Sequence, residues 1–362
     1  MKKIICTVTT DLVFDQRMRR ICTSLSNAGY DVLLIGRKKK KSPELTAEKH
    51  KQHRIECLFE KGPLFYLEFN IRLFLYLISH KTDAVSSIDL DTILAGRLAS
   101  IIKGFKQTYD AHEYFTEMEE LADRRLVKTA WKIIEKITVP FINHGYTVSE
   151  GYADLFKSEY GVEYKIVRNA TVLIDEIPDT PKENIILYQG AVNYGRGLIS
   201  LIEAMHKVKG TLIICGDGDL FEIVKKKIDD EHLEKKVKLL GYIQPLELKR
   251  YTKSAKIGLT LFEAKGLSNK YSMANRFFDY MHAGMPQLAM NYPEYQAFNK
   301  KYEVAKLLDD LDAFTIASSL NHLLKDENHY QYIRNKALEA RKEFNWQNEE
   351  ARLISVYQEL FA

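Results

Sequence analysis

Residues 184–216 read NIILYQGAVNYGRGLISLIEAMHKVKGTLIICG, and this stretch decides the fold. Two apolar runs, NIILYQG and TLIICG, flank a segment with apolar residues at helical spacing from about Leu198 to Val208. A strand, a helix and a second strand in this order predict a βαβ unit, whose two strands are parallel and whose helix covers one face of the sheet.

The same alternation continues on both sides of this unit. Downstream lie KVKLLG (236–241) and AKIGLTLF (255–262), and upstream lie KKIICTVTT (2–10), DVLLIG (31–36), AVSSID (84–89) and QTYDAH (107–112). Between the two series, residues 175–182 form an acidic stretch flanked by prolines. We therefore expect two doubly wound α/β domains, residues 1–174 and 183–344, joined by the linker 175–182, with ligands bound at the carboxyl ends of the strands.

Bulk composition agrees with a folded enzyme-sized protein. Of 362 residues, 46% are hydrophobic and 28% are charged, which excludes a disordered chain. The four cysteines are far apart and form no C-x-x-C pair, which argues against a zinc site or a disulfide framework and suits a reducing compartment. The first apolar run is interrupted at Asp11, too early for a signal peptide, so we expect a cytoplasmic protein.

Positive charge is concentrated near the N-terminus. Residues 1–61 carry 14 Lys and Arg against 7 Asp and Glu, with the densest cluster at Arg37, Lys38, Lys39, Lys40 and Lys41. This patch is either a solvated loop or a contact for an anionic membrane surface. Nearby, LFYLEFNIRLFLYLI (64–78) is too short to span a bilayer and is either a core helix or a membrane-surface helix. The patch lacks interleaved aromatic residues, so we expect no nucleic-acid partner.

Candidate binding residues lie in the loop after the strand NIILYQG. Gly190 ends this strand, and glycines at a strand-to-helix turn let the backbone approach a phosphate. Arg196 lies in the same loop, where its guanidinium could bind a diphosphate in bidentate fashion. Such turns also occur for packing reasons, so this loop alone does not decide the function.

A second candidate segment is NRFFDYMHAGMP (275–286). Asn275 and Arg276 precede an amphipathic helix that ends at Gly284. Asp279 is an acid within this helix, and it is either a surface residue or a carboxylate that accepts bonds from the two ribose hydroxyls of a nucleotide.

This segment resembles the signature of the family-4 glycosyltransferases, which commonly reads N-K-x-x-E-Y-M-x-x-G-x-P. GDGDLFEIVKKKI (216–228), TYDAHEYF (108–115) and VRNA (167–170) also resemble motifs of that family, in the same order. The resemblance implies a GT-B fold, in which two Rossmann-like domains face each other across a cleft. It also implies that about residues 345–362 return to complete the first domain.

The resemblance implies a role for each matching residue. Arg196 would neutralise the donor diphosphate, and Asn275 and Arg276 would support the phosphates or the sugar. Asp279 would bind the ribose, and His112 would face the reacting sugar. The resemblance also implies that backbone groups at strand ends build the base pocket, at Gly216, Tyr242 and Ile243, while Gly190 remains the donor-binding glycine beside the phosphates.

The implied activity is retaining transfer of a hexose-type sugar from a UDP or GDP sugar to a cell-envelope glycan or a lipid-linked acceptor. Front-face substitution needs positive charge at the diphosphate and no enzyme nucleophile. We expect no metal and no cofactor beyond the donor nucleotide sugar. IDLD (88–91) contains a D-x-D, but we interpret it as a helix N-terminus.

Three departures from the family pattern keep alternatives open. Tyr271 replaces the first acid of a common Glu pair, Ala191 replaces a second basic residue, and Thr10-Asp11 replaces a glycine pair. One alternative is a catalytically silent GT-B protein that binds a nucleotide sugar or acts as a scaffold. Another is a nucleotide-sugar epimerase, for which Glu113 beside His112 is the clearest acid.

Overall fold

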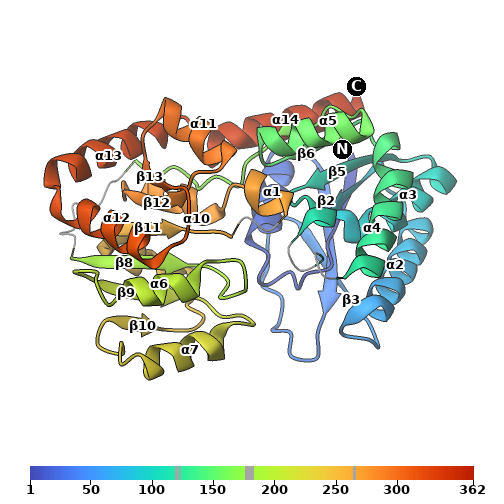
Figure 1. The fold of residues 1–362 in the computed structure, drawn as a ribbon. Coiled ribbons are helices and arrows are strands. Elements are labelled where there is room, and N and C mark those ends of the chain that lie inside the picture. The colour runs from blue at the N-terminus through green and yellow to red at the C-terminus, as the bar shows by residue number, and fades with distance from the viewer. Residues whose placement is uncertain (119–120, 122–123, 176–182, 264–265) are drawn as a thin grey trace. The chain divides into compact units, whose positions relative to one another are not determined.

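The chain folds into two compact units, residues 1–168 with 349–362, and residues 169–348. The computed structural model describes all residues except 119–120, 122–123, 176–182 and 264–265 (Figure 1). The expected boundaries were 174 and about 345, whereas the chain passes between the units at 168/169 and 348/349. Apart from Asp175, the expected linker lies outside the described residues.

The N-terminal unit contains a seven-stranded parallel sheet in the order β3-β2-β1-β4-β5-β6-β7. Its strands are β1 (Lys3–Thr7), β2 (Asp31–Lys38), β3 (Lys51–Glu56), β4 (Ala84–Ile88), β5 (Lys106–Ala111), β6 (Gly145–Thr147) and β7 (Lys165–Ile166). The strand order reverses between β1 and β4. In open parallel sheets the carboxyl ends beside such a switch point form the usual ligand site.

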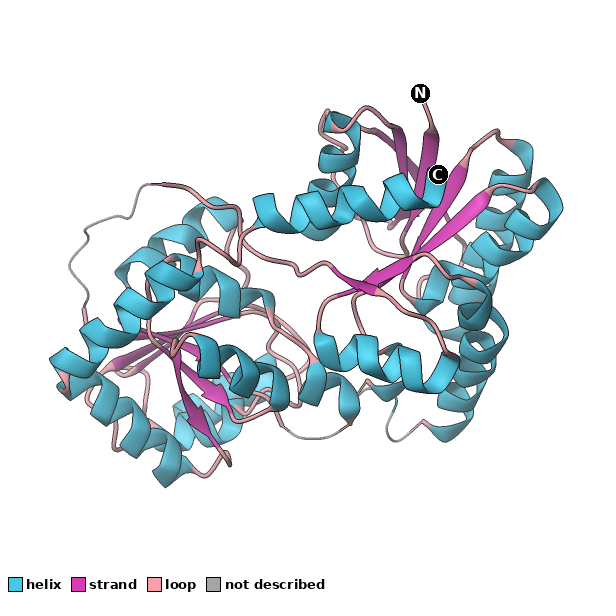
Figure 2. Ribbon diagram, turned by 90° about the horizontal axis from the view of Figure 1, so that it is seen from above, coloured by secondary structure: helices cyan, strands magenta, loops and turns pink. Residues whose placement is uncertain are grey.

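Helices cover both faces of this sheet (Figure 2). They are α1 (Gln16–Asn27), α2 (Gly62–Ser79), α3 (Leu90–Lys103), α4 (Arg125–Thr138), α5 (Glu150–Tyr160) and α14 (Trp346–Phe361), with 3₁₀ turns at Phe115–Glu117 and Val139–Phe141. Neighbouring helices α2, α3 and α4 pack side by side. The D-x-D segment begins α3 with Asp89 as N-cap, so its interpretation as a helix N-terminus is confirmed.

Helix α2 has two apolar faces. Its buried face consists of Phe65, Phe69, Leu73 and Leu77, spaced four residues apart and packed into the core of the unit. The opposite face exposes Leu64, Leu67, Ile71 and Leu75 by 51–59%. The core-helix interpretation of residues 64–78 is therefore correct for one face and leaves the other unexplained. Within the described residues, no helix combines the length and apolar character that crossing a bilayer requires.

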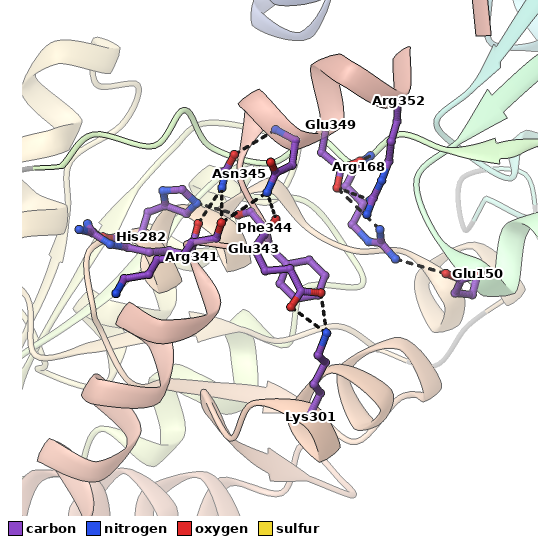
Figure 3. Close-up of polar contacts among 12 residues, drawn as sticks. Glu150, Arg168, His282, Lys301, Arg341, Glu343, Phe344, Asn345, Glu349 and Arg352 are labelled. Atoms are coloured by element: carbon purple, nitrogen blue, oxygen red, sulfur yellow. Dashed lines mark hydrogen bonds and ion pairs between the residues drawn. The ribbon is translucent and has the colours of Figure 1, made fainter. Parts of the chain in front are cut away.

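Helix α14 completes the N-terminal unit. Tyr357 is fully buried and donates its hydroxyl to Ser86 Oγ at 2.9 Å. At the start of this helix the buried carboxylate of Glu349 accepts from the Arg168 backbone N at 3.0 Å and from Arg352 Nη1 at 2.9 Å (Figure 3). These contacts attach the returning chain to β7 and its flanking loop.

The C-terminal unit contains a six-stranded parallel sheet in the order β10-β9-β8-β11-β12-β13. Its strands are β8 (Ile185–Gln189), β9 (Thr211–Cys215), β10 (Val237–Leu239), β11 (Ile257–Thr260), β12 (Gln287–Met290) and β13 (Ala305–Leu308). Its helices are α6 (Leu198–Ala204), α7 (Phe221–Asp230), α8 (Pro245–Ser254), α9 (Leu267–Tyr271), α10 (Asn275–His282), α11 (Pro293–Lys301), α12 (Ala313–Lys325) and α13 (Glu327–Ala340). The switch point lies between β8 and β11.

Polar contacts fix the C-terminal end of α10. His282 Nε2 donates to the Phe344 carbonyl at 2.8 Å, and Arg341 Nη1 donates to the His282 carbonyl at 3.2 Å (Figure 3). The buried Phe277, Phe278 and Met281 hold the same helix in the core. Helix α10 is therefore anchored along its length, and its polar residues are held in place at the sheet edge.

Candidate functional site

Arg276 lies at the switch point of the C-terminal sheet. Its guanidinium is buried between two aromatic rings, with Cζ 4.8 Å from the ring centre of Tyr188 and 4.6 Å from that of Phe262. Nη2 donates to the Leu261 carbonyl at 3.3 Å, and Nε has no hydrogen-bond partner. No ion pair joins Arg276 to a carboxylate among the described residues. Because burying a charge costs several kcal/mol, this site is suited to an anionic ligand.

Arg196 reaches the same place from the loop after β8. Its Cζ lies 4.7 Å from the ring centre of Phe262, the ring that also contacts Arg276. Burial raises the pKa of Tyr295 to about 12, and the charges of Arg276 and Arg196 act in the opposite direction. The structure thus brings the two predicted cations together at one site, where each guanidinium gains from the aromatic face.

Two of the predicted glycines form the floor beside these cations. A Cβ at Gly190 would lie 3.0 Å from Arg276 Nη1, so the guanidinium faces this backbone directly. A Cβ at Gly216 would lie 1.8 Å from the Gly190 carbonyl oxygen, so a side chain at residue 216 would force the two turns apart. The ends of β8 and β9 therefore present bare backbone, which suits close approach of a phosphate.

Asp279 lies one turn along α10 from Arg276. One carboxylate oxygen accepts from Thr171 Oγ1 at 2.6 Å and the other from Gln189 Nε2 at 2.9 Å. Gln189 in turn accepts from Thr252 Oγ1 at 3.0 Å. Asn275 is exposed in the first turn of α10, where helix N–H groups favour an anion.

Tyr242 and Ile243 follow strand β10 at the edge of the same sheet. Tyr242 is 56% exposed, and the partly buried Ile243 packs against the apolar cluster that contains Leu187 and Cys215. The Gly216 N–H donates to the Gly241 carbonyl at 2.8 Å, which draws this loop towards the glycine turn. The predicted residues of the C-terminal unit thus either follow strands β8, β9 and β10 or lie on α10.

His112 is the predicted site residue of the N-terminal unit, and it follows β5. Its Nδ1 lies 3.1 Å from Asp89 Oδ2, and the Glu113 N–H donates to Asp89 Oδ1 at 3.3 Å. Burial lowers the pKa of His112, but attraction to Asp89 outweighs it and raises the pKa to about 10. The imidazole is therefore protonated at neutral pH, while 31% of its side chain remains exposed.

Two acids beside His112 were missed as site residues by the sequence analysis. Asp89 has a φ of 53°, a conformation that is strained for a residue with a Cβ and that is found most often at functional sites. Burial and the nearby Asp89 charge raise the pKa of Asp91 to about 8, and Thr9 Oγ1 donates to its carboxylate. Both acids were available in IDLD (88–91), which follows a strand at the switch point.

Phe262 and Gln189 were also missed. Phe262 supports both arginines, and Gln189 connects Asp279 to Thr252. Gln189 is the last residue of β8, and Phe262 follows β11. Their strand-end positions were the only signal in the sequence, because an aromatic residue and an amide carry no motif of their own.

A cavity of about 900 Å³ lies in the N-terminal unit. His112, Asp89 and Asp91 line it together with residues of α2 and α4. Its volume falls within the range of about 300–1,000 Å³ that is typical of small-molecule sites. Each unit thus has a candidate binding site at the carboxyl ends of its strands.

Most of the C-terminal unit matches a family model of known proteins. Residues 173–340 match the family model of Glycosyl transferases group 1. An uncharacterized glycosyltransferase of Methanocaldococcus jannaschii is 25% identical over 182 residues, which cover 48% of this chain and 45% of that protein. The chain thus matches less than half the length of this curated relative.

Solved structures resemble the whole chain. Sucrose-phosphate synthase from Thermosynechococcus elongatus has a TM-score of 0.84 at 16% identity, over 100% of this chain and 99% of that one. HepE from Anabaena, solved with UDP and glucose, has a TM-score of 0.79 at 13% identity, over 99% and 100%. At these identities the likeness concerns the fold, and it confirms the expected GT-B class with two doubly wound α/β units.

Proposed function

We propose that the chain is a retaining glycosyltransferase that moves a hexose from a UDP or GDP sugar to a cell-envelope glycan or a lipid-linked acceptor. The observation that carries this proposal is the pair of guanidinium groups, Arg196 and Arg276, on the ring of Phe262 beside the bare backbone of Gly190. This arrangement suits a diphosphate, because two planar cations can each offer paired N–H donors to phosphate oxygens.

The donor would be bound in three parts. Arg196 and Arg276 would hold the diphosphate, with Gly190 allowing close approach. Asp279 would accept the ribose hydroxyls in exchange for part of its present bonds to Thr171 and Gln189. The base would lie towards Gly216, Tyr242 and Ile243, where backbone groups at the ends of β9 and β10 are available.

The chemical step needs stabilisation of negative charge on the leaving diphosphate. In front-face substitution that phosphate takes the proton of the attacking hydroxyl, so no protein nucleophile is required. Two preorganised guanidinium groups lower the energy of the developing charge, and we propose that they serve where other enzymes use a divalent cation. His112, protonated by its contact with Asp89, would donate a hydrogen bond to the sugar or acceptor.

The lysine patch at residues 38–41 supports a contact with a membrane surface. Lys39, Lys40 and Lys41 are exposed, and Lys38 pairs with Glu56 at 2.6 Å. The Lys40 N–H lies 3.4 Å from a Glu60 carboxylate oxygen, close to the start of α2 and its exposed apolar face. We propose a cytoplasmic enzyme that associates peripherally with the anionic inner face of the cytoplasmic membrane through these lysines.

The test is a donor panel with matched variants. Purified protein is incubated with UDP and GDP sugars together with glycan and alkyl-glycoside acceptors, and release of free nucleotide is measured with and without EDTA for wild type and for Arg276→Met. Turnover in EDTA that disappears in Arg276→Met supports the proposal, and NMR of the product reports the anomeric configuration. Donor binding without turnover would favour the silent protein, and conversion of the donor sugar without nucleotide release would favour the epimerase.

A further inference from the structure

The cavity of the N-terminal unit has two chemically different ends. One end lies at the carboxyl ends of β1, β4 and β5, where Thr9, Asp91 and His112 line it. The rest lies among α2, α3 and α4 and is apolar, lined by Tyr66, Leu67, Leu94, Val127, Ala130, Trp131 and Ile134. A ligand that fits both ends must be amphiphilic.

Three aromatic side chains that line the cavity pack against one another. Tyr66 and Trp131 meet edge to face with ring centres 5.3 Å apart, and Phe115 meets Trp131 in the same way at 5.0 Å. Leu67 is 59% exposed and Leu126 is 88% exposed although both line the cavity. Large apolar side chains exposed around a cavity are typical of a binding site whose ligand covers them.

The polar end favours hydroxyl groups over phosphate. The cavity lining includes three carboxylates, Asp15, Asp89 and Glu113, and the carboxyl group of Asp91 with its raised pKa of about 8, against the cations His112 and Arg124. Carboxylates accept hydrogen bonds from hydroxyl groups and repel phosphate oxygens. Asn70, which also lines the cavity, donates to the Asp91 carbonyl at 2.8 Å, and its buried Oδ1 has no hydrogen-bond partner.

We infer that this cavity binds the acceptor as a glycoside with one hydrocarbon chain. The sugar would lie at Asp89, Asp91 and His112, and the hydrocarbon would lie between α2 and α4. The identification of the ligand as the acceptor rests on the proposed function, whereas the binding of an alkyl glycoside does not. Among acceptors, this selects the lipid-linked class over a free glycan, since a free glycan would leave the apolar walls uncovered.

Binding can be measured through the cavity itself. The chain has two tryptophans, Trp131 in the cavity and Trp346 in the C-terminal unit, so Trp346→Phe leaves Trp131 as the single indole. In that background Trp131 fluorescence is titrated with methyl, hexyl, octyl and decyl β-glucoside below their micelle concentrations. We expect affinity to rise about fourfold per methylene until the cavity is filled. A response that does not depend on chain length would overturn the inference.

Two substitutions on α2 distinguish ligand binding in the cavity from nonspecific binding to exposed apolar side chains. Leu67 and Leu75 are exposed to similar extents, 59% and 54%, but only Leu67 lines the cavity. We expect Leu67→Glu to weaken decyl glucoside binding at least tenfold and Leu75→Glu to leave it unchanged. Equal effects of the two changes, or none from Leu67→Glu, would contradict a cavity site. Decyl phosphate should bind more weakly than decyl glucoside, and the reverse order would refute the sugar position.

Donor assays distinguish failure of this inference from failure of the proposed function. If nucleotide release from the donor persists but alkyl glucosides do not bind, the cavity inference is wrong and the transferase remains. If decyl glucoside binds with the expected variant pattern but no donor releases its nucleotide with any acceptor, the cavity is a lipid site and the transferase proposal fails. Glycosylated decyl glucoside, lost in Leu67→Glu and retained in Leu75→Glu, supports both.

Discussion

Arg276 and Asp279 lie one turn apart on α10 with opposite charges, yet Asp279 binds Thr171 and Gln189, at 2.6 and 2.9 Å. Thr171 and Gln189 each bind one oxygen of the Asp279 carboxylate, whereas the Arg276 guanidinium contacts Tyr188, Phe262 and the Leu261 carbonyl. Residues three apart on a helix can contact each other, but here the two side chains have these different neighbours. The proposed donor site depends on the buried Arg276 guanidinium, which is suited to an anionic ligand.

Loss of either site arginine should impair catalysis. We expect Arg196→Ala and Arg276→Ala each to lower kcat/KM, because each removes a preorganised donor to the leaving diphosphate. The loss should correspond to about 2–4 kcal/mol of transition-state stabilisation. Arg250→Ala is the matched control, an exposed arginine of the same unit on α8 that is outside this site. Steady-state kinetics check this, and near-normal turnover in both site variants would show that the diphosphate binds elsewhere.

Gly216→Ala should disrupt the packing of the turn at Gly216 against the turn at Gly190. The added Cβ would lie 1.8 Å from the Gly190 carbonyl, and we expect a loss of about 1–3 kcal/mol in unfolding free energy together with weaker UDP binding. Gly161→Ala is the control, since Gly161 also has a positive φ but its Cβ would meet nothing within 4 Å. Urea unfolding compares the two, and equal losses would mean that backbone strain alone explains the effect.

Stability should fall with rising pH because of Asp91. Its folded pKa of about 8 lies above the ordinary value of 3.8, so its contribution is present below pH 4 and is lost as pH rises through 8. We expect Asp91→Asn to flatten the pH dependence of the melting temperature between pH 5 and 8. The contribution of His112, lost between about pH 6.5 and 10, should remain. An unchanged profile in Asp91→Asn would exclude a raised pKa at this carboxyl.

Membrane attachment should depend on the lysine patch. Basic residues near an anionic surface contribute about 1 kcal/mol each, so changing Lys38–Lys41 to Ser should release the protein from anionic liposomes. Four exposed lysines of the C-terminal unit, Lys209, Lys225, Lys226 and Lys249, changed to Ser serve as the control. Sedimentation measures both. Binding to neither neutral nor anionic liposomes would exclude the membrane, and binding unaffected by the Lys38–Lys41 change would exclude this patch.

Local pattern predicted much of the fold. Apolar strands, helix caps and glycine turns depend on residues close in sequence, so the alternation from KKIICTVTT to AKIGLTLF gave the expected α/β architecture. The loop with Arg196 and the start of α10 with Arg276 were likewise visible as motifs.

Contacts between distant segments were not predictable in the same way. Asp89 and His112 meet because β4 and β5 are neighbours in the sheet, and Phe262 meets both arginines because β11 lies beside β8. The cavity depends on the spacing of α2 and α4, which no single segment encodes. Strand order and helix packing are tertiary properties, so a pattern along one chain leaves them open.

The most direct test of the donor site is the affinity of UDP and GDP for wild type and Arg276→Met, measured by calorimetry alongside unliganded melting temperature. Met keeps apolar contact with Tyr188 and Phe262 but removes a buried charge without a carboxylate partner. We expect an equal or higher melting temperature in Arg276→Met. We also expect at least tenfold weaker diphosphate binding, with affinity for the bare nucleoside unchanged. Diphosphate affinity equal to that of wild type would contradict it.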